Sequence, residues 1–261
     1  MQRLLPFMRV NYDFIAPNYH ARYASGNALP GIADLLHAFV RDLNAQKILE
    51  VGCGSGRWLD ELQAIAPHII GLDFSLGMLS QARQRNNTVP LTRGTAKQLP
   101  FESSLFDLVF CINALHHFDQ PQNFIAESYR ALRRGGALIA INIDPHNIGT
   151  WCVYDYFKGT RETDLKRFPK IEGLKEWMRE TGFKKIETRI ADHVSSHKIG
   201  RDVLSDHFLQ KHGTSQLALL SDKAYAEGIS KIEAAIAAAE SRNEEIVFAA
   251  EFSFPAVIGY K

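Results

Sequence analysis

The residues with the clearest chemical potential are three alternate glycines and an acid that follows them. Gly52, Gly54 and Gly56 come directly after the apolar run that ends at Val51. Glycine lets the backbone turn sharply out of a strand and leaves no Cβ between a ligand and the main-chain N–H groups. Asp73 follows Gly52 at the distance of about 20 residues at which a second strand ends beside a ribose. Together these residues predict a site for an adenosyl cofactor.

The spacing of the glycines narrows the choice of cofactor. A dinucleotide-binding loop has glycine at its first, third and sixth positions, and Arg57 stands at the sixth position counted from Gly52. A nicotinamide-dependent oxidoreductase is therefore the weaker alternative. A phosphate-binding P-loop is disfavoured as well, because no Gly-Lys-Ser/Thr sequence follows.

Four further segments extend this pattern into an ordered set. Together with Glu50-x-Gly52-x-Gly54-x-Gly56, the set resembles the class I S-adenosylmethionine-dependent methyltransferases, in particular the small-molecule group that includes the ubiquinone and menaquinone biosynthesis enzymes. The resemblance covers roughly residues 45–145, which we therefore interpret as the cofactor-binding core. The four segments are residues 71–79 (GLDFSLGML), 94–101 (GTAKQLPF), 106–118 (FDLVFCINALHHF) and 132–138 (LRRGGAL).

The resemblance implies roles for individual residues. Asp73 would accept hydrogen bonds from both ribose hydroxyls, and Met78 would lie against the adenine. Thr95 stands where the family commonly has an aspartate that binds the adenine amino group, so adenine recognition would depend more on the backbone of Ala96. Asn113, at the end of the fourth strand, would hold the methionyl part. The expected cofactor-binding residues are Glu50, Gly52, Cys53, Gly54, Gly56, Asp73, Phe74, Met78, Thr95, Ala96, Asn113, Tyr19 and Arg22.

Two histidines are the candidates for proton transfer. His116 and His117 lie on the loop that borders the methyl group in the resembled family, and imidazole titrates near neutral pH. A structural role beside Asp119 is the alternative for either. Aromatic residues that follow the fifth strand are candidates for the acceptor pocket, and ordinary core packing is their alternative. These aromatic residues are Trp151, Tyr154, Tyr156 and Phe157.

The N-terminal segment, residues 1–30, is similar to one that folds over the cofactor in this family. In that interpretation Tyr19 and Arg22 belong to a lid, and Arg22 binds the carboxylate of the cofactor. An amphipathic helix that packs on the edge of the sheet by its aromatic residues is the alternative.

Alternating strand and helix patterns predict an α/β fold over a single domain, residues 1–261. The predicted sheet is doubly wound, Rossmann-like, seven-stranded and mostly parallel, with an antiparallel last strand. Residues 192–242 break the alternation and predict a helical cap inserted before that strand. The alternative is that these helices pack elsewhere for stability or form a homodimer. The predicted strands are residues 47–52, 69–73, 89–93, 105–113, 137–144 and 185–190, followed by a strand or hairpin within 245–261.

The composition of the chain agrees with an enzyme that acts on small molecules. The chain has 261 residues and a net charge of +1, which supplies no field for a nucleic-acid partner. No run of about 18 apolar residues predicts a membrane span. Three scattered cysteines and the absence of a signal peptide pattern favour a cytoplasmic location. His193 and His197 lack the companions of a zinc site, so no metal is expected.

The sequence therefore predicts an enzyme that transfers a methyl group from S-adenosylmethionine to a small-molecule acceptor by in-line displacement and releases S-adenosylhomocysteine. The enzyme's part would be to align the two reactants and exclude water. A noncatalytic protein that binds S-adenosylmethionine is the alternative, because such a protein would keep the glycines and Asp73.

Overall fold

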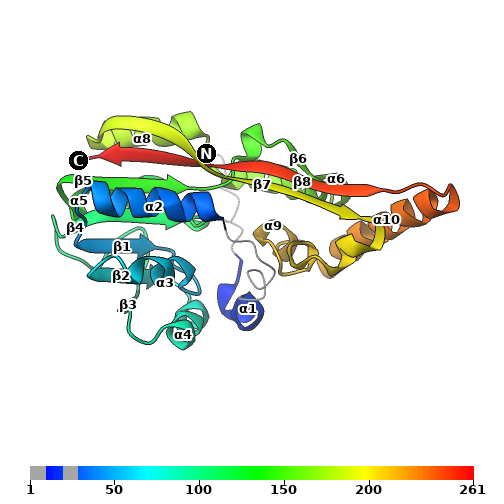
Figure 1. Ribbon diagram of the computed structural model, residues 1–261, viewed down its shortest axis with the longest axis horizontal. Coiled ribbons are helices and arrows are strands. Elements are labelled where there is room, and N and C mark those ends of the chain that lie inside the picture. The colour runs from blue at the N-terminus through cyan, green and yellow to red at the C-terminus, as the bar shows by residue number, and fades with distance from the viewer. Residues whose placement is uncertain (1–9, 20–28) are drawn as a thin grey trace, which may run out of the picture.

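The computed structural model describes residues 10–19 and 29–261, in which strands and helices alternate (Figure 1). The strands are β1 (Lys47–Val51), β2 (His68–Asp73), β3 (Leu91–Arg93), β4 (Phe106–Ile112), β5 (Leu132–Ile141), β6 (Thr150–Trp151), β7 (Lys184–Ile199) and β8 (Val247–Tyr260). The α-helices are α1 (Tyr12–Tyr19), α2 (Pro30–Asp42), α3 (Arg57–Gln63), α4 (Leu76–Arg85), α5 (Pro121–Ala131), α6 (Cys152–Tyr156), α7 (Thr160–Arg167), α8 (Ile171–Thr181), α9 (Ser215–Ala218) and α10 (Asp222–Ser241). Short 3-10 turns are η2 (Leu115–His117), η3 (Pro145–Asn147), η4 (Gly200–Ser205) and η5 (His207–Leu209).

The described strands form one sheet whose order is β3-β2-β1-β4-β5-β8-β6, with β7 paired along β8. Strands β1 to β5 pair in parallel, and β8 runs antiparallel to β5 and to β7. The prediction of a mostly parallel sheet with an antiparallel last strand is thus confirmed. The number of strands is eight rather than seven, because the two residues of β6 pair with β8 beyond the end of β5.

Alternate residues of the central strands enter two different hydrophobic cores. Ile48 and Leu108 face a core that includes residues of α2 and α3, whereas Leu49 and Val109 face one that includes residues of α5 and α8. All four side chains are fully buried or nearly so. Helices cover both faces of the central strands, so the side chains on both faces are apolar. In the sequence these strands therefore appear as continuous apolar runs.

Two helices begin at residues that are typical of helix starts. Ser75 caps α4, where its Oγ accepts a hydrogen bond of 3.1 Å from the backbone N–H of Met78. Pro121 occupies the first turn of α5, a position that needs no backbone donor.

The two longest strands extend beyond the sheet. Strands β7 and β8 continue as a two-stranded ribbon past the end of β5, and α10 lies at its far end (Figure 1). A third hydrophobic core lies there, built from the distal part of β8 and from α6, η4, η5, α9 and α10. The sequence-based start of the helical insertion at Asp192 is wrong. Residues 192–199 continue β7, because they pair in register with residues 247–254 of β8, and the insertion begins at Gly200.

Three negative findings apply to residues 10–19 and 29–261. No helix there has the length and hydropathy that a bilayer crossing needs. No group of three or more His, Cys, Asp or Glu side chains is placed to bind a metal ion. Cys53, Cys111 and Cys152 carry free thiols.

Candidate active site

A cavity of 550 Å³ lies where β1, β2 and β4 end, and α1 forms part of its wall. Because these strands are parallel, their carboxyl ends meet at one edge of the sheet, where open α/β sheets bind ligands. Predicted site residues and newly found ones share its wall. The lining residues are Val10, Asn11, Tyr12, Asp13, Tyr19, Val51, Gly52, Gly54, Leu72, Asp73, Phe74, Ser75, Met78, Gly94, Thr95, Ala96, Lys97, Ile112, Asn113, Ala114, His117, Phe118, Asp119 and Gln120.

The glycine turn forms the wall at the end of β1. Gly52 has φ +77°, and a Cβ at this position would lie 2.5 Å from the Cβ of Ala114. Gly54 has φ +52°, and a Cβ there would meet no atom within 4 Å. Gly52 is therefore required by packing, whereas Gly54 leaves open space on the side of the cavity. Gly56 lies behind the wall, where it begins α3 in a left-handed conformation.

Asp73 connects the end of β2 to the glycine turn. Its Oδ2 accepts a hydrogen bond of 2.9 Å from the N–H of Gly54, and its Oδ1 accepts one of 2.8 Å from the N–H of Ser75. Burial raises the pKa of this carboxyl despite these bonds. Each carboxylate oxygen can accept two hydrogen bonds, so Asp73 keeps acceptor capacity for ligand hydroxyls.

Two predicted cofactor residues are buried behind the wall. Glu50 on β1 is 1% exposed, and its Oε2 makes no hydrogen bond within the described structure. Burial raises the pKa of Glu50 well above its usual value, and the charge of Asp73 adds to this effect. Cys53 packs in the core beneath the turn, with its pKa likewise raised by burial. The structure therefore places the carboxyl of Glu50 behind the glycine turn, where burial favours its uncharged form.

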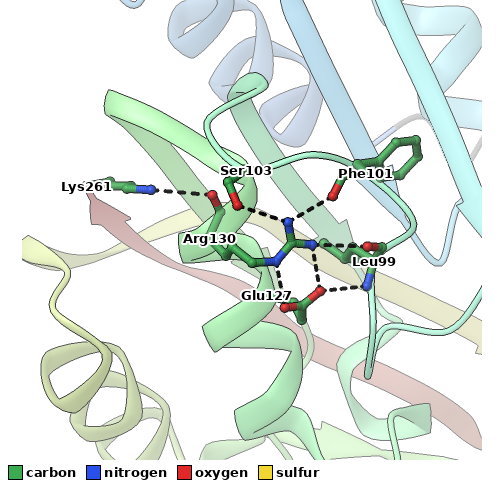
Figure 2. Close-up of polar contacts among 6 residues, drawn as sticks. All are labelled: Leu99, Phe101, Ser103, Glu127, Arg130 and Lys261. Atoms are coloured by element: carbon green, nitrogen blue, oxygen red, sulfur yellow. Dashed lines mark hydrogen bonds and ion pairs between the residues drawn. The ribbon is translucent and has the colours of Figure 1, made fainter.

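Thr95 and Ala96, which follow β3 in the chain, form part of the cavity wall. Residues 99–101, which come shortly after them, are held by a clamp of two side chains. Figure 2 shows this clamp, in which Arg130 and Glu127 of α5 bind the backbone of residues 99–101. The guanidinium of Arg130 donates to the carbonyls of Leu99 and Phe101 at 3.1 and 2.9 Å, and Oε2 of Glu127 accepts from the N–H of Leu99 at 2.9 Å. The clamp fixes the segment that comes directly after this part of the wall.

Helix α1 forms one side of the cavity wall and is anchored to α4. Oδ1 of Asp13 accepts 2.7 Å hydrogen bonds from Oγ of Ser75 and from the N–H of Gly77. Below this contact, Met78 packs against Ile15 and Ala16 of α1. Tyr19 lines the cavity as expected, whereas Arg22 lies outside the described residues.

His117 lies on the cavity wall between two polar side chains from distant parts of the chain. Its Nε2 is 2.6 Å from Oη of Tyr12 on α1, and its Nδ1 is 3.1 Å from Nη2 of Arg167 on α7. His116 does not line the cavity: it is 5% exposed and stacks on Phe168 with 3.9 Å between ring centroids. The structure thus brings one of the two candidate histidines to the site.

Asn113 stands at the end of β4 with a left-handed backbone, φ +49°. Asparagine tolerates this conformation better than most residues. Its Oδ1 accepts a hydrogen bond of 3.3 Å from the N–H of Ile143, so its side chain is held against the chain that follows β5.

Behind His117, Arg167 belongs to a buried network. Its Nη1 donates to Oγ of Ser215 at 3.2 Å and lies 3.5 Å from Oδ1 of Asp164. The side chains of Arg167 and Asp164 are only 6% and 0% exposed. Burial raises the pKa of Asp164 to about 6, and burial lowers the pKa of Arg167. Tyr154 donates a hydrogen bond of 2.9 Å to Oδ2 of Asp164, which connects the network to the third core.

The four aromatic residues proposed for the acceptor pocket do not line the cavity. Trp151, Tyr154, Tyr156 and Phe157 belong to the third hydrophobic core or pack directly against it. Trp151 packs against Phe252, and Phe157 is fully buried. These positions match the alternative of core packing, because α6 turns back onto β8 and α10 instead of the edge of the sheet.

Tyr12, Asp13 and Arg167, whose side chains make the polar contacts described above, were absent from the sequence-based list. Tyr12 and Asp13 lie in the segment recognised as a lid, so its Tyr-Asp pair could have indicated them. Arg167 lies in no motif, and no feature of the sequence connects it to His117. Only the fold brings this side chain to the ring of His117.

Comparisons with known proteins agree with this arrangement. The methyltransferase domain family matches residues 49–140. A demethylmenaquinone methyltransferase of Oceanobacillus iheyensis is 32% identical over 54% of this chain and 71% of its own length. The phthiotriol/phenolphthiotriol dimycocerosates methyltransferase 1 of Mycobacterium ulcerans is 35% identical, but the match covers only 42% of each chain.

The fold is also shared with a solved structure, the Haemonchus contortus phosphoethanolamine N-methyltransferase 2 in complex with S-adenosyl-L-methionine. The TM-score is 0.61 at 18% identity, over 100% of this chain and 61% of that one. Similarity at this level of identity establishes a common fold.

Proposed function

We propose that this chain, which belongs to the class I S-adenosylmethionine-dependent methyltransferases, transfers a methyl group to a small-molecule acceptor bound in the 550 Å³ cavity. S-adenosylmethionine is the methyl donor of this family, and S-adenosylhomocysteine is its product. One observation carries the proposal: the glycine turn, Asp73 and the polar pair Tyr12 and His117 line the same cavity.

The cavity fits the donor at several points. Gly54 leaves space in which a Cβ would meet no protein atom, so a ligand can approach the backbone there. Asp73 keeps acceptor capacity for two ribose hydroxyls, and Met78 offers a polarizable thioether to a flat ring. Thr95 and Ala96 would receive the adenine, and Asn113 and Tyr19 would lie toward the methionyl end. When bound, S-adenosylmethionine supplies an activated methyl group on a sulfonium.

The protein's own residues would then orient the reactants and exclude water. Helix α1, which the bonds of Asp13 to Ser75 and Gly77 hold against the cavity, would help to keep water away from the reacting groups. Correct alignment of two bound reactants contributes roughly 7 kcal/mol or more to a rate enhancement. The pair formed by Tyr12 and His117 provides the polar groups that can hold the nucleophile or take up its proton.

An acceptor of small size agrees with the shape and charge of the molecule. We assign the acceptor side of the wall to Tyr12, His117, Phe118, Asp119 and Gln120, and the whole cavity, which must also hold the donor, has a volume of 550 Å³. The net charge of +1 supplies no general attraction for a polyanion.

The test has two parts. Calorimetry first measures the affinity for S-adenosylmethionine and S-adenosylhomocysteine. Release of S-adenosylhomocysteine is then followed with a panel of quinols, phenols and amines. We expect binding of both nucleosides and turnover of at least one acceptor that depends on Tyr12 or His117. Tight binding with no turnover on any acceptor would instead favour the noncatalytic binding protein.

A further inference from the structure

We propose that Arg167 is a positioning residue that holds His117 as the neutral tautomer protonated at Nε2. In this arrangement the oxygen of Tyr12, and not the imidazole of His117, meets the proton of the methyl acceptor. The part that concerns the tautomer depends on the geometry alone, whereas the part that concerns the acceptor rests on the proposed methyl transfer.

The hydrogen-bonding roles follow from the chemistry of the guanidinium group. A guanidinium has five N–H donors and no acceptor, so Nη2 of Arg167 must donate across the 3.1 Å to Nδ1 of His117. Nδ1 therefore presents its lone pair, and the proton of the neutral ring is on Nε2. Across the 2.6 Å contact, Nε2–H then donates to Oη of Tyr12. The hydroxyl proton of Tyr12 is directed to a group other than His117.

The same geometry disfavours the imidazolium form. Protonation of Nδ1 would place an N–H against the N–H of Arg167 and a second positive charge beside the guanidinium. The other titratable groups near the ring are His116, Asp119, Asp13 and Asp164. His116 lies beside it with 3.9 Å between ring centroids, and Asp119 follows on the same loop. Asp13 on α1 is bonded to Ser75 and Gly77, and Asp164 lies against Arg167 itself.

Arg167 is well held for this role. Its side chain is only 6% exposed, Nη1 binds Ser215 of α9, and Asp164 balances its charge. Asp164 is in turn bonded to Tyr154, which belongs to the periphery of the third core. The distal part of the molecule thereby fixes the orientation of a ring in the cavity, although none of Asp164, Arg167 and Ser215 lines it.

The consequence for catalysis is a defined path for the proton. As the acceptor atom bonds to the methyl carbon, the carbon–sulfur bond breaks, its electron pair stays on sulfur, and the proton of the acceptor must leave. His117 cannot take this proton at Nδ1, which receives the bond from Arg167, or at Nε2, which already carries a proton. Tyr12 can take it after its own hydroxyl proton has passed to solvent, because the Nε2–H of His117 and the nearby charge of Arg167 would stabilise the phenolate that is left. The transferred proton restores the hydroxyl of Tyr12, which loses it to solvent before the next turnover.

The tautomer can be observed without any activity. The protein is labelled with ¹⁵N-histidine, and His117 is assigned by comparison with His117→Asn. Long-range ¹⁵N–¹H correlation spectra then distinguish a protonated ring nitrogen from one with a free lone pair. We expect Nε2 protonated and Nδ1 unprotonated from pH 5.5 to pH 8. Arg167→Met should allow the ring to titrate near the usual histidine value of about 6.5. A protonated Nδ1 in the unmodified protein at pH 8 would overturn the proposal.

Because Arg167→Met leaves Asp164 buried without its partner, Arg167→Met/Asp164→Asn serves as a second variant that removes both charges. Thermal unfolding identifies which variant is folded. The ring of His117 should titrate in either one, while Arg167→Lys, which keeps a positive donor, should restore the neutral ring. A ring that remains neutral at pH 5.5 in a folded variant without Arg167 would also overturn the proposal.

Kinetics tests the role of Tyr12 once an acceptor is known. Tyr12→Phe should lower kcat by about 10²-fold or more and remove the ionisation that governs kcat in the unmodified enzyme, without weakening S-adenosylhomocysteine binding. Arg167→Met should introduce a dependence on a group with a pKa of about 6.5. A kcat that already follows such a group in the unmodified enzyme, and that persists in Tyr12→Phe, would show that His117 is the base. Absence of turnover on all acceptors would contradict the proposed function and leave the result on the tautomer standing.

Discussion

The two halves of the cavity are constructed differently. In the cofactor half, the carboxylate of Asp73 binds the backbone N–H groups of Gly54 and Ser75, which lie 19 and 2 positions away in the chain. In the acceptor half, His117 is bonded to the side chains of Tyr12 and Arg167, which lie 105 and 50 positions away. The first half thus depends on local backbone geometry, and the second on side chains that only the tertiary fold brings together.

This difference has consequences for how each half responds to substitution. A bond to a backbone N–H needs one particular side chain, because every residue except proline supplies the N–H. A bond between two side chains needs a particular residue at both ends. We therefore expect changes of the side chain that binds the backbone in the cofactor half to act on affinity for the nucleoside, changes of its glycine turn to act on stability, and changes in the acceptor half to act on turnover.

The largest effect is expected for Gly52→Ala. The added Cβ would lie 2.5 Å from the Cβ of Ala114, and the backbone would keep a left-handed φ of +77°. Strain and overpacking together should lower the free energy of unfolding by about 2–4 kcal/mol. Urea unfolding measures this loss, with Gly173→Ala as control, because a Cβ at Gly173 would meet nothing within 4 Å. Equal stability of the two variants would contradict the role of Gly52 in packing.

Asp73→Ala is expected to have the next largest effect. It removes a carboxylate that binds two backbone N–H groups and faces the cavity. Affinity for S-adenosylhomocysteine should fall by about 1.5–3 kcal/mol, the usual range for hydrogen bonds to a charged group. Calorimetry provides the measurement. The affinity of Asp73→Asn, which keeps one acceptor oxygen, should lie between those of Asp73→Ala and the unmodified protein. An unchanged affinity in Asp73→Ala would mean that another residue holds the ribose.

A smaller effect is expected for substitution of Asp13, whose hydrogen bonds stabilise the docking of α1 on α4. Asp13→Ala removes two hydrogen bonds at the N-terminus of α4, and caps of this kind contribute about 1 kcal/mol. Asp13→Asn keeps one acceptor oxygen and should lose less. Hydrogen exchange of the α1 amides, with and without S-adenosylhomocysteine, measures the docking of the helix.

The pH dependence of this contact has a definite sign. The bonds from Ser75 and Gly77 lower the pKa of Asp13 below its usual 3.8. A lowered pKa means that the folded state favours the carboxylate, so the stabilisation is complete above pH 3.8 and is lost as the pH falls through the lower value. The difference between Asp13→Ala and the unmodified protein should therefore shrink below about pH 4. A difference that is constant across this range would contradict the charged form of the contact.

Glu50→Gln is expected to have the smallest effect on affinity for the nucleoside. The carboxyl of Glu50 lies behind the wall, and its raised pKa favours the uncharged form, so an amide of similar shape should change nucleoside affinity by less than about 1 kcal/mol. Its raised pKa implies that the unmodified protein loses stability as the pH rises above 4.5, whereas the variant does not. Urea unfolding between pH 4.5 and pH 8 should show the variant gaining relative to the unmodified protein. A strong loss of affinity would show that Glu50 is ionised and supports the turn as a carboxylate.

Sequence patterns were most informative where a single residue type reports a backbone conformation. The alternate glycines correspond to the sharp turn that the structure shows after β1, and Ser75 and Pro121 stand at helix starts, where these residue types are common. The division between β7 and the helical insertion was misplaced, because the polar residues 192–199 obtain their strand conformation from pairing with β8. Such pairing is a property of two distant segments and is not visible in either one.

The aromatic residues after β5 illustrate the same limit for the site. Trp151 and Phe157 have the size and polarity expected of a pocket wall, and equally those of a core. Their burial against Phe252 and against Gly228 of α10 was decided by the direction in which α6 leaves the sheet. Conversely, Arg167 carries no local signal, and its role depends on where α7 is placed.

The sequence alone determined the cofactor half of this protein: the family, the parallel sheet and the turn between β1 and α3. The reason is that glycine, proline and capping residues restrict the backbone within a few positions of themselves. Only the tertiary structure decided which histidine reaches the cavity, which residues hold it and where the aromatic cluster lies. These outcomes depend on contacts between side chains far apart in the chain, and such contacts exist only after the sheet and its helices have packed.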